Sequence, residues 1–221
     1  MRKLGRIAAL ALFVTVAGAA CGQTAGIQAT VVDQRGRPVA DAVVVAVPAD
    51  PNMRLPARPH DGVVDQIDKQ FVPKVQVVDV GTAITFPNND HVRHQVYSFS
   101  PAKRFELPLY AGVPAKPIVF ERPGIVVLGC NIHDWMIGYV YVSESPYFAK
   151  TRADGLATLA NLPARAYIVR VWHPQMTVAE ETTRKTIDVM PGSHADVAWT
   201  LDLKPETGIR RAPVPGQGRG Y

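Results

Sequence analysis

The stretch Ile125–Met136, which reads IVVLGCNIHDWM, joins a short apolar strand to a cluster of potential metal ligands. The run before Cys130 is apolar and ends in a glycine, which predicts a buried strand with the thiol at its rim. His133 and Met136 follow at intervals of three residues, so a thiolate, an imidazole and a thioether share one loop. Soft donors of this kind favour copper over hard cations. The stretch therefore predicts a metal loop at the end of a β-strand.

A second imidazole is available upstream, in the segment Asn88–Val96, which reads NNDHVRHQV. His94 opens a run of alternating residues typical of a strand, whereas His91 lies in a polar turn, and either could be the ligand. One Cys, two His and one Met form the ligand set of a blue-copper site, with a trigonal His₂Cys plane and a weak axial Met. Zinc sites rarely recruit a thioether, so the donor set favours copper.

The N-terminus has the order of residues found in a secretory signal peptide. Three cations, Arg2, Lys3 and Arg6, precede the apolar run from Ile7 to Ala17, and small residues follow it. The run is shorter than the roughly 20 apolar residues that a membrane-spanning helix needs. We expect residues 1–20 to be a signal peptide, cleaved near 20–25, and the mature protein to be periplasmic, with no transmembrane segment. The minor alternative is a lipoprotein anchored through Cys21.

The basic charge of the chain comes from its two ends. The formal net charge is +5, and loss of the three signal-peptide cations lowers it to +2. The Gly-, Pro- and Arg-rich tail 204–221, which we expect to be disordered, carries four cations and one acid. The folded part is then left with a net charge of −1. This distribution gives no support for nucleic-acid binding, which needs cations clustered on one face.

The two cysteines, Cys21 and Cys130, are not expected to form a disulfide with each other in the mature protein. Exported proteins normally pair their thiols, but Cys21 lies at the edge of the expected signal peptide. Cys130 is then left without a partner, and metal ligation explains a lone exported thiol. The alternative is a buried, inert cysteine that packs as a small hydrophobic residue.

The remaining sequence predicts many short strands separated by turns. The chain contains 17 Gly and 19 Pro, and we find no amphipathic helix or internal repeat. Two β-branched runs within Ile27–Val47, on either side of a Gly/Pro turn, predict a hairpin, and Pro48–Gly62 predicts a linker. Further strands are expected at 75–80, 83–86, 94–99, 117–121, 125–128, 137–142, 156–159, 166–172, 184–189 and 195–203.

The segment Gly81–Val142 resembles the cupredoxin family, in particular its amicyanin and plastocyanin branch. The resemblance rests on GTAITF at 81–86, on NND at 88–90 with HQV at 94–96, and on the Cys-x₂-His-x₂-Met loop. It implies a Greek-key β-sandwich that holds one type 1 copper ion. The implied ligands are His94, Cys130, His133 and Met136, with His94 preferred to His91. Two departures are Gln95 where the family has Asn, and the lack of Pro between Cys130 and His133.

The same resemblance implies roles around the ligands. Asn89 and Asp90 would tie the ligand loops together by side-chain hydrogen bonds, and the backbone N–H of Gln95 would point towards the thiolate. The edge of the His133 ring would lie at the surface. Trp135 would either form an apolar docking patch there or pack on the core. Redox proteins are the implied partners, and four occupied ligand positions leave no open site for an enzyme substrate.

The flanking segments resemble a different module, the carboxypeptidase-regulatory, transthyretin-like sandwiches. The resemblance rests on VVD at 31–33, GRPV at 36–39 and the run Thr151–Val171. We therefore expect an all-β protein, in which a cupredoxin domain at 63–145 interrupts a transthyretin-like sandwich at 26–62 and 146–203. One larger β-sandwich is the alternative. The whole chain also resembles exported proteins labelled methylamine-utilisation proteins.

The expected function is that of a periplasmic blue-copper protein that carries single electrons between redox partners. Two alternatives use the same residues differently. A copper-binding or delivery protein would release its metal easily and have little colour. A structural binding module with a vestigial copper loop would be unaffected by copper.

Overall fold

The computed structural model describes residues 25–53, 55, 58–114 and 116–205, and its regular structure is almost entirely β-strand, joined by turns and loops. In this part of the chain the one helical element is a short 3₁₀ turn, η1 (Glu180–Thr183). The expected all-β fold class is confirmed. No helix among the described residues is long and apolar enough to span a membrane. The expected signal peptide, Cys21 and the part of the tail beyond residue 205 lie outside the described residues.

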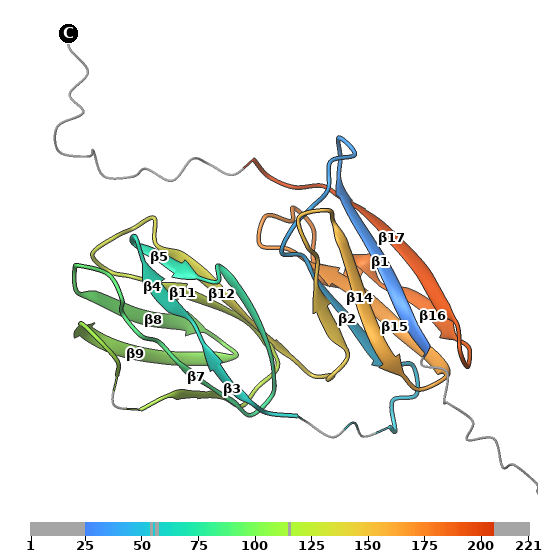
Figure 1. Cartoon of the computed structure of the whole chain (residues 1–221), viewed down its shortest axis with the longest axis horizontal. Helices are drawn as coiled ribbons and strands as arrows, with labels where there is room; N and C mark the ends of the chain where they lie inside the picture. Colours follow the sequence, from blue (N-terminus) through green and yellow to red (C-terminus); the bar gives the residue numbers. More distant parts are fainter. Residues whose placement is uncertain (1–24, 54, 56–57, 115, 206–221) are drawn as a thin grey trace, which may run out of the picture.

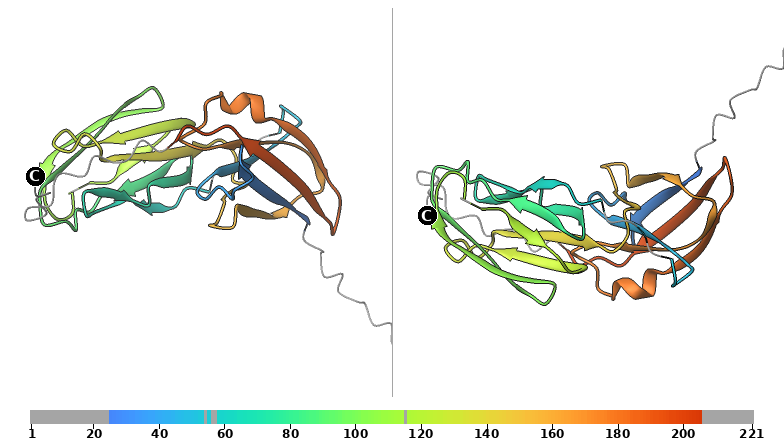
Figure 2. Two further views of the ribbon diagram at one scale, coloured as in Figure 1. Left: turned by 90° about the horizontal axis from the view of Figure 1, so that it is seen from above. Right: turned by 90° about the horizontal axis from the view of Figure 1, so that it is seen from below.

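The strands form two lobes that lie end to end (Figures 1 and 2). The terminal lobe, built from both ends of the chain, packs the three-stranded sheet β14-β1-β17 against the four-stranded sheet β13-β2-β15-β16. Its strands are β1 (Ala25–Asp33), β2 (Val43–Pro48), β13 (Phe148–Lys150), β14 (Leu156–Leu162), β15 (Arg165–Trp172), β16 (Lys185–Val189) and β17 (His194–Leu201).

The central lobe contains the middle of the chain. A five-stranded sheet, β6-β12-β11-β8-β9, shares an apolar core with the three-stranded sheet β10-β7-β3 and the hairpin β4-β5. Its strands are β3 (Asp61–Val63), β4 (Asp65–Ile67), β5 (Gln70–Val72), β6 (Val75–Asp79), β7 (Thr82–Thr85), β8 (His94–Ser100), β9 (Lys103–Tyr110), β10 (Ile118–Phe120), β11 (Gly124–Gly129) and β12 (Ile137–Ser143).

The hairpin predicted within Ile27–Val47 forms only at its turn, where Val32 and Pro38 make one antiparallel bridge. Both strands form, but β1 pairs with β14 and β17, whereas β2 pairs with β13 and β15 in the facing sheet. The burial of β2 explains this arrangement. Val44 and Ala46 face the core of the terminal lobe, and Val43 and Val45 on the other side pack against the central lobe. A strand with both faces buried has a continuous apolar sequence. Such a strand lies between two layers, as β2 does, and need not pair with the strand that precedes it.

One register fixes which side chains of the five-stranded sheet face the core. β8 and β11 are antiparallel, with Tyr97 opposite Gly129. Because side chains alternate along a strand, His94 and Val96 of β8 lie on the same side of the sheet as Leu128 and Cys130. This side is the buried one. The register therefore directs a thiol and an imidazole from neighbouring strands into the same end of the core.

The two lobes are joined by an aromatic contact. Trp172, at the end of β15, packs on Tyr139 and Tyr141 of β12, with ring centroids 5.7 Å apart in both pairs. The hydroxyl of Tyr141 also donates a hydrogen bond of 2.5 Å to Glu180, whose carboxylate is paired with Arg170 at 2.7 Å. Apolar packing and a partly buried ion pair thus fix the terminal lobe against the central one.

We expect Trp172→Ala to lower the free energy of unfolding by about 3–5 kcal/mol, because it removes a large buried ring and leaves a cavity between the lobes. Guanidinium titration followed by tryptophan fluorescence and circular dichroism measures the change. Val178→Ala, at an exposed position, is the control and should cost less than about 0.5 kcal/mol. Equal effects of the two substitutions would contradict the importance of this contact.

Candidate metal centre

Three potential ligands converge at the end of the central lobe, where β8 begins and β11 ends. The Sγ of Cys130 lies 3.7 Å from Nδ1 of His94 and 3.8 Å from Nδ1 of His133. All three potential ligand atoms lie within 4.8 Å of one another, and they form the one such group among the described residues. The structure thus brings together one thiol and two imidazole nitrogens from sites 36 and 3 residues apart.

The group is largely shielded from water. His94, Cys130 and Met136 are each at most 3% exposed, and His133 is half-buried. Met136 packs in the same core cluster as Cys130, and its backbone N–H donates to the carbonyl of His133, which closes the turn between them. A buried thiol without a disulfide partner, facing two imidazoles, is an arrangement that a bound metal satisfies.

Asp90 orients the His94 ring. One carboxylate oxygen lies 2.9 Å from Nε2 of His94, on the side of the ring away from Cys130, and also accepts the backbone N–H of Lys69 at 2.7 Å. The other oxygen accepts the backbone N–H of His91. Burial alone would raise the pKa of Asp90, but the hydrogen bonds from His94, Lys69 and His91 outweigh it and hold the pKa below its usual value. The carboxylate is therefore ionised and can hold Nε2 protonated, which leaves Nδ1 free as a ligand.

The residues expected around the ligands take different positions. Asp90 contacts a ligand directly, whereas the Asn89 side chain donates to Asp65 at 2.7 Å and the Gln95 side chain donates to Glu106 at 2.6 Å. His91 is exposed and does not join the group. That the backbone N–H of Gln95 points towards the thiolate stays a prediction.

Asn88 is a positioning residue that the sequence did not single out. Its buried side chain donates to the carbonyls of Val92 and Tyr110, and its oxygen accepts the N–H of Asp90. It therefore ties the loop before His94 to the edge strand β9. The Pro-Asn-Asn-Asp turn carries this signal, but the sequence does not say which of its polar side chains points inward.

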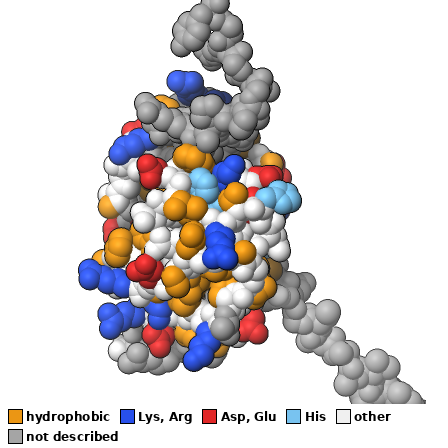
Figure 3. Space-filling view, turned by 90° about the vertical axis from the view of Figure 1, so that its left-hand side faces the viewer, with side chains coloured by type: hydrophobic (Ala, Val, Ile, Leu, Met, Phe, Trp, Pro, Cys, Tyr) orange, Lys and Arg blue, Asp and Glu red, His pale blue; other side chains and the backbone are white. Residues whose placement is uncertain are grey.

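His133 is the ligand candidate nearest to solvent. Its ring lies 5.2 Å from the ring of Trp135, centroid to centroid, and 4.9 Å from that of His94. Burial lowers the pKa of His133, and the nearby His94 and Lys69 lower it further. Exposed apolar residues, Ile132 and Val92, flank the ligand loops. Apolar side chains gather around histidine on this end of the molecule (Figure 3).

The donor separations fit one first-row metal ion. Bonds of about 2.0 Å to nitrogen and about 2.3 Å to sulfur, meeting at about 120°, separate N and S by about 3.7 Å. The observed separations of 3.7 and 3.8 Å match this trigonal arrangement. The donor chemistry and the spacing of the group therefore fit a metal bound by His94, Cys130 and His133.

Comparison with known proteins finds similarity to solved structures. No family model matches the chain, and no curated protein matches it. A purple cupredoxin from Nitrosopumilus maritimus shares 26% identity over 38% of this chain and 100% of its own, with a TM-score of 0.34. A Cu-containing nitrite reductase from Thermus scotoductus shares 24% over 45% of this chain and 27% of its own, with a TM-score of 0.36. A reduced amicyanin variant shares 21% over 47% of this chain and 99% of its own, with a TM-score of 0.34.

We expect the metal-free protein to lose stability as the pH falls below about 6.5, the usual pKa of histidine. The pKa of His133 is lower in the folded state, so in this range the unfolded chain binds the proton more readily. The contribution of neutral His133 to stability is therefore complete above the pKa of the unfolded chain. It is lost as the pH falls through the lower pKa of His133 in the folded protein. NMR titration of the His133 ring and urea midpoints between pH 5 and 7.5 measure it. A steeper pH dependence in His133→Gln than in the parent protein would contradict this assignment.

Proposed function

We propose that this protein binds one copper ion through His94, Cys130, His133 and Met136, and that it carries single electrons between redox partners in the periplasm. The observation that carries the proposal is the convergence of one buried Sγ and two Nδ1 atoms at 3.7 and 3.8 Å. Met136 is buried in the same core cluster as Cys130, which makes it the candidate for the axial ligand. A bound copper ion would supply a one-electron redox couple.

The choice of copper rests on the donors. Thiolate, thioether and imidazole together are soft to intermediate ligands, and a His₂Cys plane with a weak axial Met is the blue-copper arrangement. A structural zinc site would instead have four strong donors in a tetrahedron, without a thioether. The fourth donor of this chain is a methionine in the buried core, so its ligand set favours copper.

The surrounding residues hold the ligands in place for repeated electron transfer. β8 and β11 position His94 and Cys130, and Asp90 locks the His94 ring. A rigid site undergoes only a small structural change when it gains or loses an electron. The apolar residues around it tune its reduction potential. With four protein donors there is no open ligand position, and so we propose a carrier and not an enzyme.

The terminal lobe and the export of the protein belong to the same proposal. We propose that a signal peptide directs the chain to the periplasm and that the terminal lobe, at 26–62 and 146–203, is a transthyretin-like sandwich interrupted by the cupredoxin domain at 63–145. The support is that strands from both ends of the chain share one core, separate from the core of the central lobe. The terminal lobe contributes no residue to the candidate metal group.

We expect the purified protein with one equivalent of Cu(II) to show an intense visible absorption band and a narrow copper hyperfine splitting. Both signatures report a short Cu–thiolate bond, so Cys130→Ser should abolish them. Optical and electron paramagnetic resonance spectra make the measurement, with Met53→Leu, at an exposed methionine outside the core, as a control that should retain both signatures. A colourless protein with ordinary tetragonal copper would contradict electron transfer and favour copper delivery. A protein that does not bind copper would favour a structural role.

We expect Asp90→Ala to weaken copper binding by about 10- to 100-fold, the usual cost of losing the hydrogen-bond partner of a metal-bound imidazole. Competition with a chelator of known affinity measures the dissociation constant. Asp61→Ala removes an exposed carboxylate from the same lobe and should leave the affinity unchanged. Equal losses in the two variants would mean that only the net charge of the lobe matters.

A further inference from the structure

The edge strand β9 contains one extra residue close to the candidate metal centre. From the turn between β8 and β9 back to Val96, the two strands face each other in regular antiparallel register. Beyond Val96 the register shifts, so that His94 lies opposite Tyr110, where regular pairing would place Leu109. A strand with one residue more than its partner forms a β-bulge, and bulges beside functional sites change the face to which a side chain points.

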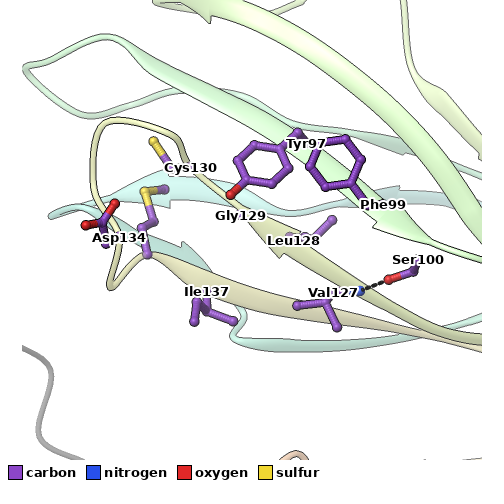
Figure 4. A pocket seen from close by; sticks show the side chains of 10 residues that line it. Tyr97, Phe99, Ser100, Val127, Leu128, Gly129, Cys130, Asp134 and Ile137 are labelled. Carbon is purple, nitrogen blue, oxygen red and sulfur yellow. Dashed lines mark hydrogen bonds between the residues drawn. The ribbon is translucent and has the colours of Figure 1, made fainter.

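The two faces of β8 have different surroundings. Tyr97 and Phe99 lie side by side on the outer face, with ring centroids 5.2 Å apart, and line a pocket there (Figure 4). His94 and Val96 lie on the inner face, where both are fully buried, because side chains alternate along a strand. The residue of β9 that points inward opposite His94 is therefore the neighbour of a candidate ligand.

The bulge decides which residue of β9 this is. Phe105 and Leu107 pack against the core, so regular alternation would also point Leu109 inward. Instead, Leu109 is 47% exposed, whereas Tyr110 is half-buried and packs against the same core. The bulge therefore leaves an apolar side chain in solvent and brings a tyrosine beside His94.

The hydroxyl of Tyr110 joins the two sheets of the central lobe. It donates to the carbonyl of Phe86, directly after β7, at 2.6 Å, and it accepts the side-chain N–H of Gln66 in β4, also at 2.6 Å. Burial raises the pKa of Tyr110 to about 12, so the hydroxyl is protonated at neutral pH and can act as this donor. We call the contacts among Tyr110, Gln66 and Phe86 the cross-sheet brace.

A second connection leads from Tyr110 to His94 through the loop before β8. The carbonyl of Tyr110 accepts the side-chain N–H of Asn88 at 2.8 Å, and the side-chain oxygen of Asn88 accepts the N–H of Asp90 at 3.0 Å. Asp90 in turn holds Nε2 of His94 at 2.9 Å. Tyr110 is thus connected to one imidazole twice, as its neighbour across the strand pair and through this loop.

One buried atom of the cross-sheet brace lacks a partner. Gln66 is fully buried, and its Oε1 makes no hydrogen bond within the part of the chain that the structure describes. An unpaired buried acceptor is destabilising, and an apolar side chain at this position would avoid it. The N–H groups of the same amide donate to the Tyr110 hydroxyl and to the carbonyl of Pro87. These bonds explain why an amide occupies the position.

We infer that Tyr110 is a positioning residue for the metal, because the cross-sheet brace fixes the orientation of the His94 ring and so the geometry of the bound copper ion. This inference rests on the proposed function. Without the hydroxyl, Phe86 and Gln66 lose a shared partner, and the edge strand beside His94 is released from the facing sheet. The ring then has more freedom, and a metal bond that depends on its orientation weakens.

Tyr110→Phe removes the hydroxyl and keeps the ring, and Tyr167→Phe in the terminal lobe is its matched control. Tyr167 is also buried, and its hydroxyl donates to the carbonyl of Pro163 at 3.0 Å. Both substitutions should lower the midpoint of urea unfolding. We expect only Tyr110→Phe to weaken Cu(II) binding, by about tenfold in competition with a chelator. It should also widen the copper hyperfine splitting, because a looser ligand lets Cu(II) approach tetragonal geometry.

A measurement on the metal-free protein separates this inference from the proposed function. The Nε2–H of His94 is buried and held by Asp90, so NMR should detect it as a slowly exchanging proton. We expect Tyr110→Phe to speed its exchange by about fivefold or more, whereas the amides of β11 and β12, which report unfolding of the whole lobe, should change less. Tyr167→Phe should leave the exchange of this proton unchanged.

A second variant tests whether the members of the brace act together. Gln66→Met removes the amide and keeps a side chain of similar size. If the two residues form one unit, the double variant should bind Cu(II) at most about twofold more weakly than Tyr110→Phe alone. Losses that add in full would overturn the brace as the connection between Tyr110 and the metal.

The remaining outcomes are also decisive. Unchanged copper affinity, hyperfine splitting and His94 exchange in Tyr110→Phe, with a urea midpoint lowered as in Tyr167→Phe, would overturn the inference and leave Tyr110 a structural residue. A parent protein that gains no visible band with copper refutes the proposed function. The exchange of the His94 proton decides the inference even then, because faster exchange supports the positioning of the ring and unchanged exchange overturns it.

Discussion

A single backbone pairing, Gly129 opposite Tyr97, sets the geometry on which the rest of the central lobe depends. It places Cys130 and His94 on the inner side of neighbouring strands, where their donor atoms face each other across 3.7 Å. A slip of one residue between the strands would turn every side chain of one strand to the opposite face, because the side-chain period of a strand is two. The ligand group would then be divided between the core and the solvent. The candidate metal centre thus depends on strand register as well as on the sequence of the loop.

The buried donors impose a cost that the surrounding residues offset. Polar side chains taken out of water need hydrogen-bond partners, and an imidazole offers two nitrogens. Asp90 satisfies one nitrogen of His94 and Asn88 holds the loop that carries Asp90, so the other nitrogen is left facing the thiol. The hairpin β4-β5 completes this arrangement, because the N–H of Lys69 at its turn donates to the same carboxylate. One carboxylate oxygen of Asp90 therefore joins two segments that are distant in sequence, the β4-β5 turn and the loop before β8.

The sequence predicted the strands near the metal loop and the composition of the candidate site, but not the pairing of strands. The run before Cys130 and the alternation after His94 are local signals, and both strands form where they indicate. The hairpin β4-β5 was missed because its strands are three residues long, within a segment without clear alternation. The hairpin around Gly36 does not extend beyond its turn, because both faces of β2 are buried and one of them packs on a second lobe, which only the tertiary structure supplies. The role of Asn88 depends on which side chains of the turn point inward, and this is set by non-local contacts such as that with Tyr110.

The strand β12 connects the candidate ligand loop to the interface between the lobes. Its first residue, Ile137, follows Met136 directly, and Tyr139 and Tyr141 contact Trp172 of the terminal lobe. With a rise of about 3.4 Å per residue, the four steps from Ile137 to Tyr141 span about 14 Å. The terminal lobe therefore contacts the later part of this strand and contributes no residue to the candidate ligand group. Arg170 and Glu180 form an ion pair that also accepts the Tyr141 hydroxyl, so β12 links the contact between the lobes to the loop that carries Cys130, His133 and Met136.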